Sequence, residues 1–356
     1  MLADNDIFEI VKRVKEEVEK ENLVSTKPIS TVKDKVKRIV DEYNKEMNNV
    51  YKYNEKNEIV DKQKNIIEEK TSVDQIVFIG DPHCGSRLGL CPPKKIRMDS
   101  GTYIEPSPNQ CKMWEKFDYF WKEWVPERTK GKPFVIGFMG DICDGHPHNS
   151  KTSFSDNIND QKHIALEALA SVIEQSVGVF AVSGTEAHTG KSGEDEENIM
   201  EFLNEQTGKV YQSKEGRYAP HEWWIKIGGE DGALIHMMHH IGITGSSHAR
   251  TTAITKEVME LIIAAQKWGE QHPDIVVRAH RHTSCKVGIP SSRGDVIGFI
   301  TPAWQLKTPY AYKVIGGRTD LPEIGGGYAK AGDVIHHYVD SIVWGVKRDK
   351  PYIVTL

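Results

Sequence analysis

The chain has 356 residues and a formal net charge of -5, with 27% charged and 38% hydrophobic residues. These values match a globular protein and exclude a fibrous or wholly disordered chain. The length exceeds what one hydrophobic core usually spans, so we expect two domains, or one enzyme-sized domain with an extension. The slightly acidic balance argues against a passive nucleic-acid coat or a polybasic membrane binder, so any phosphate binding must be local.

The first twenty residues, MLADNDIFEIVKRVKEEVEK, are charged from the start and show no signal peptide. No apolar run approaches the ~20 residues that a membrane helix needs. The five cysteines are an odd number without a disulfide-like spacing. We therefore expect a cytoplasmic protein without a membrane partner.

Residues 1–72 are predicted to form a helical N-terminal arm. This segment is rich in Lys, Glu and Asn, and it has no Gly between Asp6 and Lys70. A helix-turn-helix that binds DNA is one interpretation, because basic residues gather near one helical face. We favour an arm that packs on its own domain or on another subunit, since acidic residues offset the lysines. The apolar residues at helical spacing are Ile7, Ile10, Val11, Val14, Val18, Val32, Val36, Ile39, Val40 and Tyr43.

From residue 73 to 356 the pattern is that of an α/β domain, in which short apolar strands alternate with longer amphipathic segments. Each of five predicted strands runs into a cluster of polar residues that includes Asp or His. The strands and their clusters are Gln75–Ile79 before Asp81 and His83, Pro133–Met139 before Asp141 and Asp144, Val177–Val182 before Thr185, Glu186 and His188, Ala233–Met238 before His239 and His240, and Ile275–Arg278 before His280 and His282.

These clusters predict a metal centre. Ligands of open α/β sheets bind at the carboxyl ends of the strands, and Asp with His is the ligand set of a hydrolytic divalent-metal site. One isolated His at a strand end is more often a hydrogen-bonded core residue. Five such strand ends in succession favour the metal centre instead.

The succession resembles the calcineurin-like metallophosphoesterases, whose motifs are D-x-H, G-D-x-x-D, G-N-H-[DE], a lone His and G-H-x-H. The resemblance covers residues 74 to 305. In this chain the corresponding blocks are Asp81-Pro82-His83, Gly140-Asp141-Ile142-Cys143-Asp144, Gly184-Thr185-Glu186-Ala187-His188, His239-His240 and Ala279-His280-Arg281-His282.

The resemblance implies two divalent ions, with manganese expected first and Zn, Fe, Ni or Mg as alternatives. Asp81, His83 and His282 would hold one ion, and His280 with one of the paired histidines the other. Asp141 would bridge both ions, since each carboxylate oxygen offers lone pairs. The ions would clamp a phosphate and activate water. The roles expected outside the ligand set are orientation of the catalytic His by Asp144, protonation of the leaving oxygen by His188 and charge stabilisation by Arg281.

The third block departs from the family, which has Asn directly before His. Either Thr185 replaces Asn with a weak hydroxyl ligand, or the loop bulges so that Glu186 reaches the metal. We expect Glu186, because a carboxylate binds a hard cation better than a hydroxyl does. A solvent-exposed Glu186 beside a weak second site is the alternative. At the paired histidines we expect His239 to turn inward and His240 away, since successive strand side chains point to opposite faces.

Several segments outside the motifs carry further predictions. The insertion from Ser86 to Gln110 carries Lys94, Lys95 and Arg97, and it is either a phosphate-facing lid or a surface excursion. Lys191 to Glu197 is interpreted as a solvated acidic loop. Tyr310 to Ile315 and Val334 to Leu356 are predicted strands around a turn at Gly325-Gly326-Gly327. The aromatic residues at helical spacing, predicted to be core, are Trp114, Phe117, Phe120, Trp121 and Trp124.

The sequence thus predicts a four-layer α/β sandwich of two mixed sheets flanked by helices, with an N-terminal helical extension. The expected activity is metal-dependent hydrolysis of a phosphoester, preferably a phosphodiester such as a nucleotide or nucleic acid. A phosphomonoesterase, and a catalytically weakened protein that binds metal and nucleic acid, are the alternatives. A homo-oligomer formed through the N-terminal helices remains open, because fold does not fix substrate or partner.

Overall fold

The computed structural model describes residues 73–145, 152–242, 249–312, 321–332 and 336–347, and the backbone alone of 51–53, 59–61, 66–67 and 313–315. The chain divides into two compact units, Met1–Asn65 and Ile66–Leu356.

In the first unit the described residues form two short antiparallel strands, β1 Tyr51–Tyr53 and β2 Ile59–Asp61. The predicted helical arm is therefore wrong for this stretch. Aromatic and β-branched residues favour a pleated strand and here prevail over the helical pattern of their neighbours. The helices expected nearer the N-terminus lie outside the described residues.

The first sheet of the second unit has five strands in the order β15-β14-β4-β7-β8. Its parallel centre consists of β4 Gln75–Ile79, β7 Val135–Phe138 and β8 Gly178–Ala181. Two antiparallel strands, β14 Glu323–Lys330 and β15 Tyr338–Gly345, extend it beyond β4. All three central strands match predicted ones.

The second sheet has six strands in the order β12-β13-β11-β10-β9-β3. The predicted strands β10 Ala233–Met238 and β11 Ile275–Arg278 pair in parallel at its centre. β9 Glu222–Ile227 runs antiparallel to β10, and β12 Cys285–Ser291 forms a hairpin with β13 Gly294–Ile300. The last strand, β3 Ile66–Ile67, pairs with β9.

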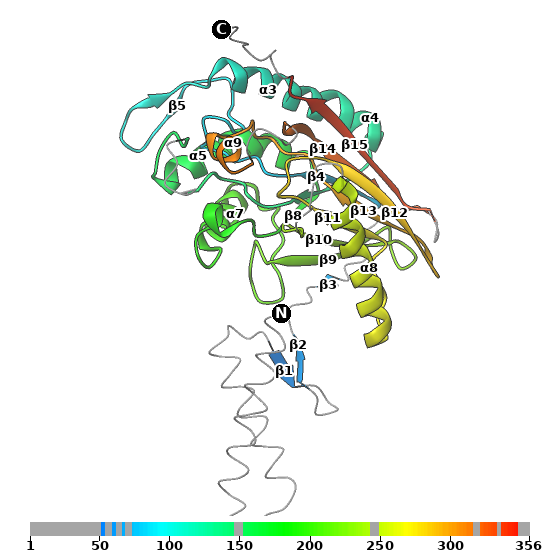
Figure 1. The fold of residues 1–356 in the computed structure, drawn as a ribbon. Coiled ribbons are helices and arrows are strands. Elements are labelled where there is room, and N and C mark those ends of the chain that lie inside the picture. The colour runs from blue at the N-terminus through cyan, green and yellow to red at the C-terminus, as the bar shows by residue number, and fades with distance from the viewer. Residues whose placement is uncertain are drawn as a thin grey trace, which may run out of the picture. The chain divides into compact units, whose positions relative to one another are not determined.

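Helices cover the outer faces of both sheets (Figure 1). Along β4, Val77 and Ile79 point into a core shared with helices, whereas Ile76 and Phe78 point into the core between the two sheets. A third cluster packs one helix on the second sheet. The described helices are α3 Pro108–Tyr119, the π-helix η1 Phe120–Trp124, α4 Val125–Thr129, α5 Ile158–Ile173, α6 Glu186–Thr189, α7 Glu194–Thr207, α8 Arg250–Trp268 and α9 Pro309–Ile315.

The four layers are thus helices, five-stranded sheet, six-stranded sheet and α8, which confirms the predicted α/β sandwich of two mixed sheets. The aromatic stripe of the α3–η1 region is buried as predicted, with Phe117, Phe120, Trp121 and Trp124 inside the outer core and Trp114 partly buried against it.

Two predictions in the C-terminal region were wrong. Tyr310 to Ile315 belongs to α9, which begins at Pro309, a residue whose fixed φ suits a first helical turn. The three glycines from Gly325 lie inside β14 rather than in a turn. A Cβ on Gly326 would lie 2.4 Å from the Phe120 ring, and one on Gly327 would lie 2.4 Å from the Phe299 ring. The glycines therefore let aromatic rings pack directly on the strand.

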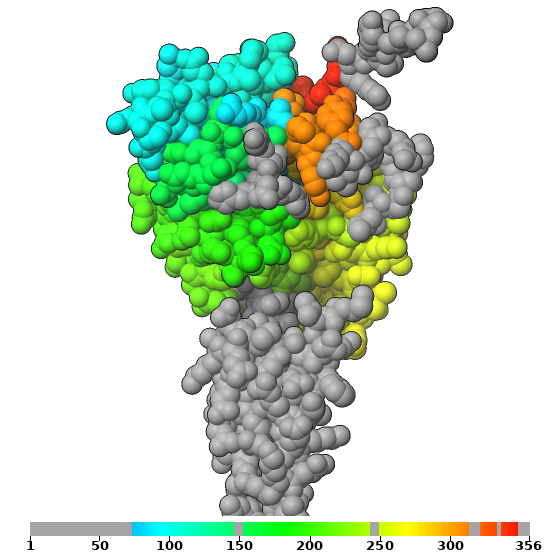
Figure 2. Space-filling view, turned by 60° about the vertical axis from the view of Figure 1, so that its left-hand side comes forward, coloured from blue at the N-terminus to red at the C-terminus, as the bar shows by residue number. Residues whose placement is uncertain are grey.

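The insertion after β4 is a packed surface element. It contains a small hairpin, β5 Ile96–Arg97 with β6 Tyr103–Ile104, and its Leu90 and Met98 are buried. Two of its basic side chains are paired, because Lys94 contacts Glu167 and Lys95 lies 2.7 Å from Glu105. Figure 2 shows the cyan part of the chain, which includes this insertion, on the surface beside the green part. Among the described helices, none has both the length and the apolar character that crossing a membrane requires.

Candidate metal centre

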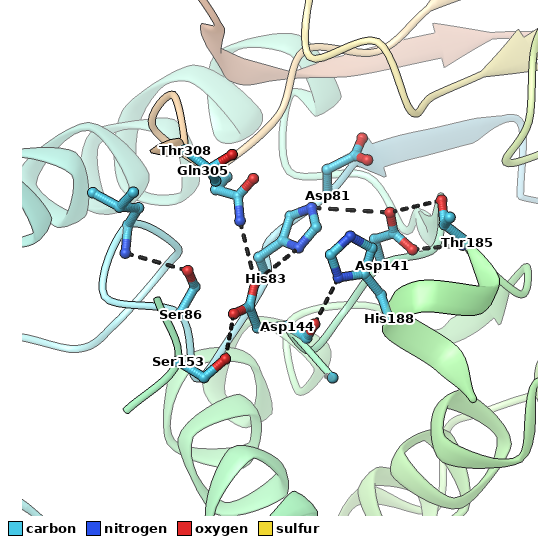
Figure 3. A network of polar contacts seen from close by, with 12 residues as sticks. Asp81, His83, Ser86, Asp141, Asp144, Ser153, Thr185, His188, Gln305 and Thr308 are labelled. Atoms are coloured by element: carbon cyan, nitrogen blue, oxygen red, sulfur yellow. Dashed lines mark hydrogen bonds and ion pairs between the residues drawn. The ribbon is translucent and has the colours of Figure 1, made fainter. Parts of the chain in front are cut away.

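The five predicted strand-end clusters converge at one end of the two sheets. Figure 3 shows residues of the first three clusters, among them Asp81, Asp141 and His188. Four groups of three residues occur there, and within each group the possible ligand atoms lie within 4.8 Å of one another. The groups are Asp81, His83 and His282; His239, His240 and His280; His83, Asp141 and His188; and Asp81, Asp141 and His239. Side chains from both sheets therefore share one site, and Asp141 occurs in two of its groups.

The first group has the donors for a cation. His282 Nε2 lies 3.3 Å from Asp81 Oδ1. Asp81 is fully buried, and although burial raises the pKa of its carboxyl, the pairing with His282 lowers it below the ordinary value. Among the described residues, Asp81 Oδ1 and both ring nitrogens of His83 have no hydrogen-bond partner. Buried polar atoms without hydrogen bonds are costly. A cation would satisfy Asp81 Oδ1 and His83 Nε2, while His83 Nδ1 lies 3.5 Å from the Asp144 carboxylate, so these residues fit a metal ion.

The second group, which consists of His239, His240 and His280, lies beside Asp141. His239 is fully buried, and its Nε2 lies 3.2 Å from Asp141 Oδ2. Burial opposes protonation of this imidazole, but the Asp141 carboxylate prevails and raises the pKa of His239 to about 10. Its Nδ1 donates to the Met139 carbonyl at 2.6 Å, which directs Nε2 into the site. A cation here would take the place of the proton on Nε2.

Thr185, rather than Glu186, projects into the second group. The Thr185 hydroxyl lies 3.2 Å from Asp141 Oδ2, 3.1 Å from His239 Nε2 and 3.0 Å from His280 Nδ1. Glu186 is exposed and belongs to no ligand group among the described residues. The expectation for Glu186 was therefore wrong: the chain does not bulge but starts the short helix α6 at Glu186, with Thr185 in the N-cap position.

Both paired histidines face the site. We expected His240 to turn away from His239, as on a strand. However, β10 ends at Met238, so the alternation does not extend to this pair. The rings of His239 and His240 lie 5.2 and 5.0 Å from the His280 ring.

His188 stands beside the first group, with its ring centroid 4.5 Å from that of His83. Its Nδ1 donates to the Asp144 backbone carbonyl at 2.6 Å. We expected Asp144 to orient this histidine, and the contact is there, but the carbonyl rather than the carboxylate makes it. The Asp144 carboxylate lies 3.5 Å from His83 Nδ1 and accepts from Ser153 Oγ at 2.6 Å.

Arg281 does not join the described cluster. Its guanidinium donates to the Gly242 carbonyl, and burial lowers its pKa. The predicted role in stabilising phosphate charge was assigned from its place between His280 and His282. Neighbouring residues in such a loop point in different directions, and the side chain is held elsewhere.

The backbone conformation of the candidate ligands is also unusual. Six non-glycine residues of the described ranges have positive φ, one of them Lys130. This left-handed region costs an L-residue about 1–2 kcal/mol, and such strain clusters at functional sites. The other five are Asp81 at 47°, His83 at 44°, Asp141 at 54°, His280 at 69° and His282 at 52°.

Close backbone approach explains the glycine of the third block. A Cβ on Gly184 would lie 2.1 Å from Asp141 Oδ1. Instead, the next residue, Thr185, donates its N–H to this oxygen at 2.6 Å. The loop after β8 thus lies directly on the carboxylate that β7 supplies.

Glu196 is a residue that the sequence did not single out. It lies in the first turn of α7 and is only 1% exposed. One carboxylate oxygen accepts from the Ile142 N–H at 2.9 Å and the other from the Gly184 N–H at 2.5 Å. Burial and the nearby Asp141 raise its pKa to about 7. It therefore connects the loops that carry Asp141 and Thr185, and the prediction of a solvated acidic loop was wrong at this position.

No family model matches the chain, and no curated protein is similar to it at the level searched. Three solved structures illustrate what it resembles in fold. A conserved protein of Streptococcus pneumoniae, described as a predicted phosphoesterase, is 12% identical, with 77% of this chain and 91% of that chain covered and a TM-score of 0.31. Vacuolar protein sorting 29 of Cryptosporidium parvum is 11% identical, with 78% and 100% covered and a TM-score of 0.35. The sulfate thiohydrolase SoxB of Thermus thermophilus is 11% identical, with 78% and 58% covered and a TM-score of 0.31.

These TM-scores are below 0.5, so the assignment of the site rests on the strands and side chains of this chain itself. Two mixed sheets between helices, with the motif residues together at one end, agree with the fold and the ligand cluster that the resemblance of the motifs implied.

Proposed function

We propose that this chain is a metal-dependent phosphoester hydrolase with a dinuclear centre, and that its preferred substrate is a phosphodiester. The observation that carries the proposal is the pair of ligand groups on either side of Asp141, built largely from residues in strained backbone conformations. Asp81, His83 and His282 would hold one ion, and His239 and His280 the other, with Asp141 between them. Bound divalent ions would supply Lewis acidity and lower the pKa of a water molecule.

The protein side chains have separate tasks. His188 Nδ1 donates to the Asp144 carbonyl, so its Nε2 is the nitrogen available to hand a proton to a leaving oxygen. The contact with Asp144 also fixes the orientation of the His188 ring, so that Nε2 is held in one position for proton transfer. Asp144 in turn holds His83 through its carboxylate. This arrangement supports acid-assisted departure of an alkoxide, the step that a phosphodiester of high leaving-group pKa requires.

A second candidate is a catalytically weakened protein that binds metal and nucleic acid. Two observations favour it: a hydroxyl stands at Thr185, where the family has an amide ligand, and Arg281 is turned to a backbone carbonyl. Against nucleic-acid binding, the ion pairs of Lys94 and Lys95 leave the insertion less basic than its sequence indicates. A phosphomonoesterase remains the closest alternative in reaction type.

The test compares bis-p-nitrophenyl phosphate with p-nitrophenyl phosphate. Protein treated with chelator would be reloaded with Mn²⁺, Zn²⁺, Ni²⁺, Co²⁺ or Mg²⁺ and assayed beside Asp141→Asn. We expect metal-dependent turnover that is faster on the diester and absent from the variant. Faster turnover of the monoester would make the chain a phosphomonoesterase. Two bound metals without turnover of either ester would favour the binding protein.

A further inference from the structure

His240 lies where a metal ligand would lie. Its ligand nitrogen is within 4.8 Å of those of His239 and His280, and its ring is 5.0 Å from each of theirs. The sequence-based ligand set contains only one of the two adjacent histidines. Because both follow the end of β10 rather than lying on the strand, both imidazoles reach the same group.

The same group lacks a strong oxygen donor from the third block. The Thr185 hydroxyl occupies that position, 3.0 Å from His280 Nδ1 and 3.1 Å from His239 Nε2. A neutral hydroxyl donates less well to a divalent cation than the carboxylate and carbonyl oxygens that hard cations prefer. Glu186 does not replace it, since its side chain is exposed outside the group. An additional imidazole would therefore complete the ligand set.

We propose that His240 is a third imidazole ligand of the ion beside Asp141, and that this ion belongs to the zinc, iron, cobalt or nickel class. The proposal extends the dinuclear centre of the proposed function. Imidazole ligands suit Zn, Fe and Ni, whereas Mg and Mn are typically held by carboxylates, carbonyls and water. With His239, His240 and His280, the second group has three nitrogen donors against the two carboxylates and two imidazoles available around Asp81. The two ions would differ in kind.

The test measures metal binding without turnover. Chelator-treated wild type and His240→Gln would be titrated with Zn²⁺ and with Mg²⁺ by calorimetry. Loss of an outer partner of a ligand already costs about 10–100-fold in affinity, so loss of a ligand should lower the affinity for the second Zn²⁺ at least about tenfold. Mg²⁺ affinity should change less than about twofold. The Co²⁺-loaded variant should show a changed visible absorption spectrum, because one nitrogen donor is gone.

His221→Gln is the matched control. His221 is also exposed and close enough to His240 to lower the pKa of that imidazole, but it belongs to no ligand group of the described residues. Its zinc affinity should equal that of the wild type. Because His240 is exposed, the chelator-treated variant should also unfold at the wild-type urea concentration.

Unchanged zinc affinity and an unchanged cobalt spectrum in His240→Gln would overturn the inference, and a raised KM in that variant would then assign His240 to the substrate. An equal loss in His221→Gln would overturn it too, because the effect would be one of general charge. The outcome is separate from the proposed function: a wild type that binds two zinc ions through His240 but hydrolyses no ester would refute only the hydrolase.

Discussion

Replacing Glu196 by Gln should lower the affinity for metal and should change the stability of the metal-free protein in a pH-dependent way. The carboxylate accepts one N–H from each of two loops, at Ile142 and at Gly184. A Gln has one acceptor oxygen, and its NH₂ group would face the other N–H. One loop must then shift, together with Asp141 or Thr185, which adjoin the two amides. We expect the affinity for metal to fall about 10–100-fold, as it does when outer partners of ligands are lost.

In metal-free protein, the stability of the variant relative to the wild type should increase as the pH rises. Burial and Asp141 raise the pKa of Glu196 from 4.5 to about 7. Its neutral form is therefore favoured in the folded state, and wild-type stability falls as pH rises from 4.5 through 7. The shift corresponds to about 3 kcal/mol, since one pKa unit is about 1.4 kcal/mol. Glu196→Gln lacks this cost, so its stability relative to the wild type should rise between pH 5 and pH 8.

Urea unfolding of chelator-treated protein at pH 5 and pH 8, with calorimetric metal titration, would check both signs. Glu197→Gln is the matched control: Glu197 accepts the N–H groups of Tyr218 and Ala219 at 2.6 and 2.8 Å, away from the metal groups. It should lose stability without the loss in metal affinity. The reasoning would be refuted if Glu196→Gln bound metal like the wild type, or if its relative stability fell as the pH rose.

Three further changes address the site and the arm. His188→Ala should leave metal binding intact and slow esters of high leaving-group pKa much more than activated aryl esters, because only the former need a proton; equal slowing would indicate a ligand or positioning role. Thr185→Ala should weaken the second metal more than Glu186→Gln does, and calorimetry giving the reverse order would contradict the observed contacts. Removal of residues 1–65, which spares β3, should preserve hydrolysis of an aryl phosphodiester; a folded but inactive product would make the arm part of the site or of an obligatory dimer.

Strand positions and strand-end residues could be predicted because they follow from local rules. Short apolar runs such as Ile76 to Ile79 favour strands of a buried sheet, since they are shorter than a typical helix. Polar residues that follow parallel strands meet at the carboxyl edge of the sheet. Asp81, His83, Asp141, His239, His280 and His282 were therefore predictable as one cluster.

Side-chain direction was harder to predict. Thr185 and Glu186 are adjacent, and the choice between them depends on where α6 starts, which no short motif encodes. Arg281 sits between two ligand candidates but turns to Gly242, and Asp144 uses a backbone carbonyl that any residue could supply. Glu196 lies in a run of four acidic residues, and only the packing of α7 separates it from its exposed neighbour Glu194. These outcomes depend on tertiary contacts rather than on residue type.

The strain in the site and its proposed metals have one physical explanation. Five left-handed conformations at about 1–2 kcal/mol each lie beside buried polar atoms of Asp81 and His83 that make no hydrogen bond to the described residues. Both features oppose folding, in a protein class whose net stability is only about 5–15 kcal/mol. A cation that binds the folded chain alone contributes RT ln(1 + [L]/Kd), or about 2.7 kcal/mol at a hundredfold excess over Kd. Two such ions would offset much of the strain. The left-handed conformations direct the ligands toward the ions, and the bound ions in turn stabilise those conformations.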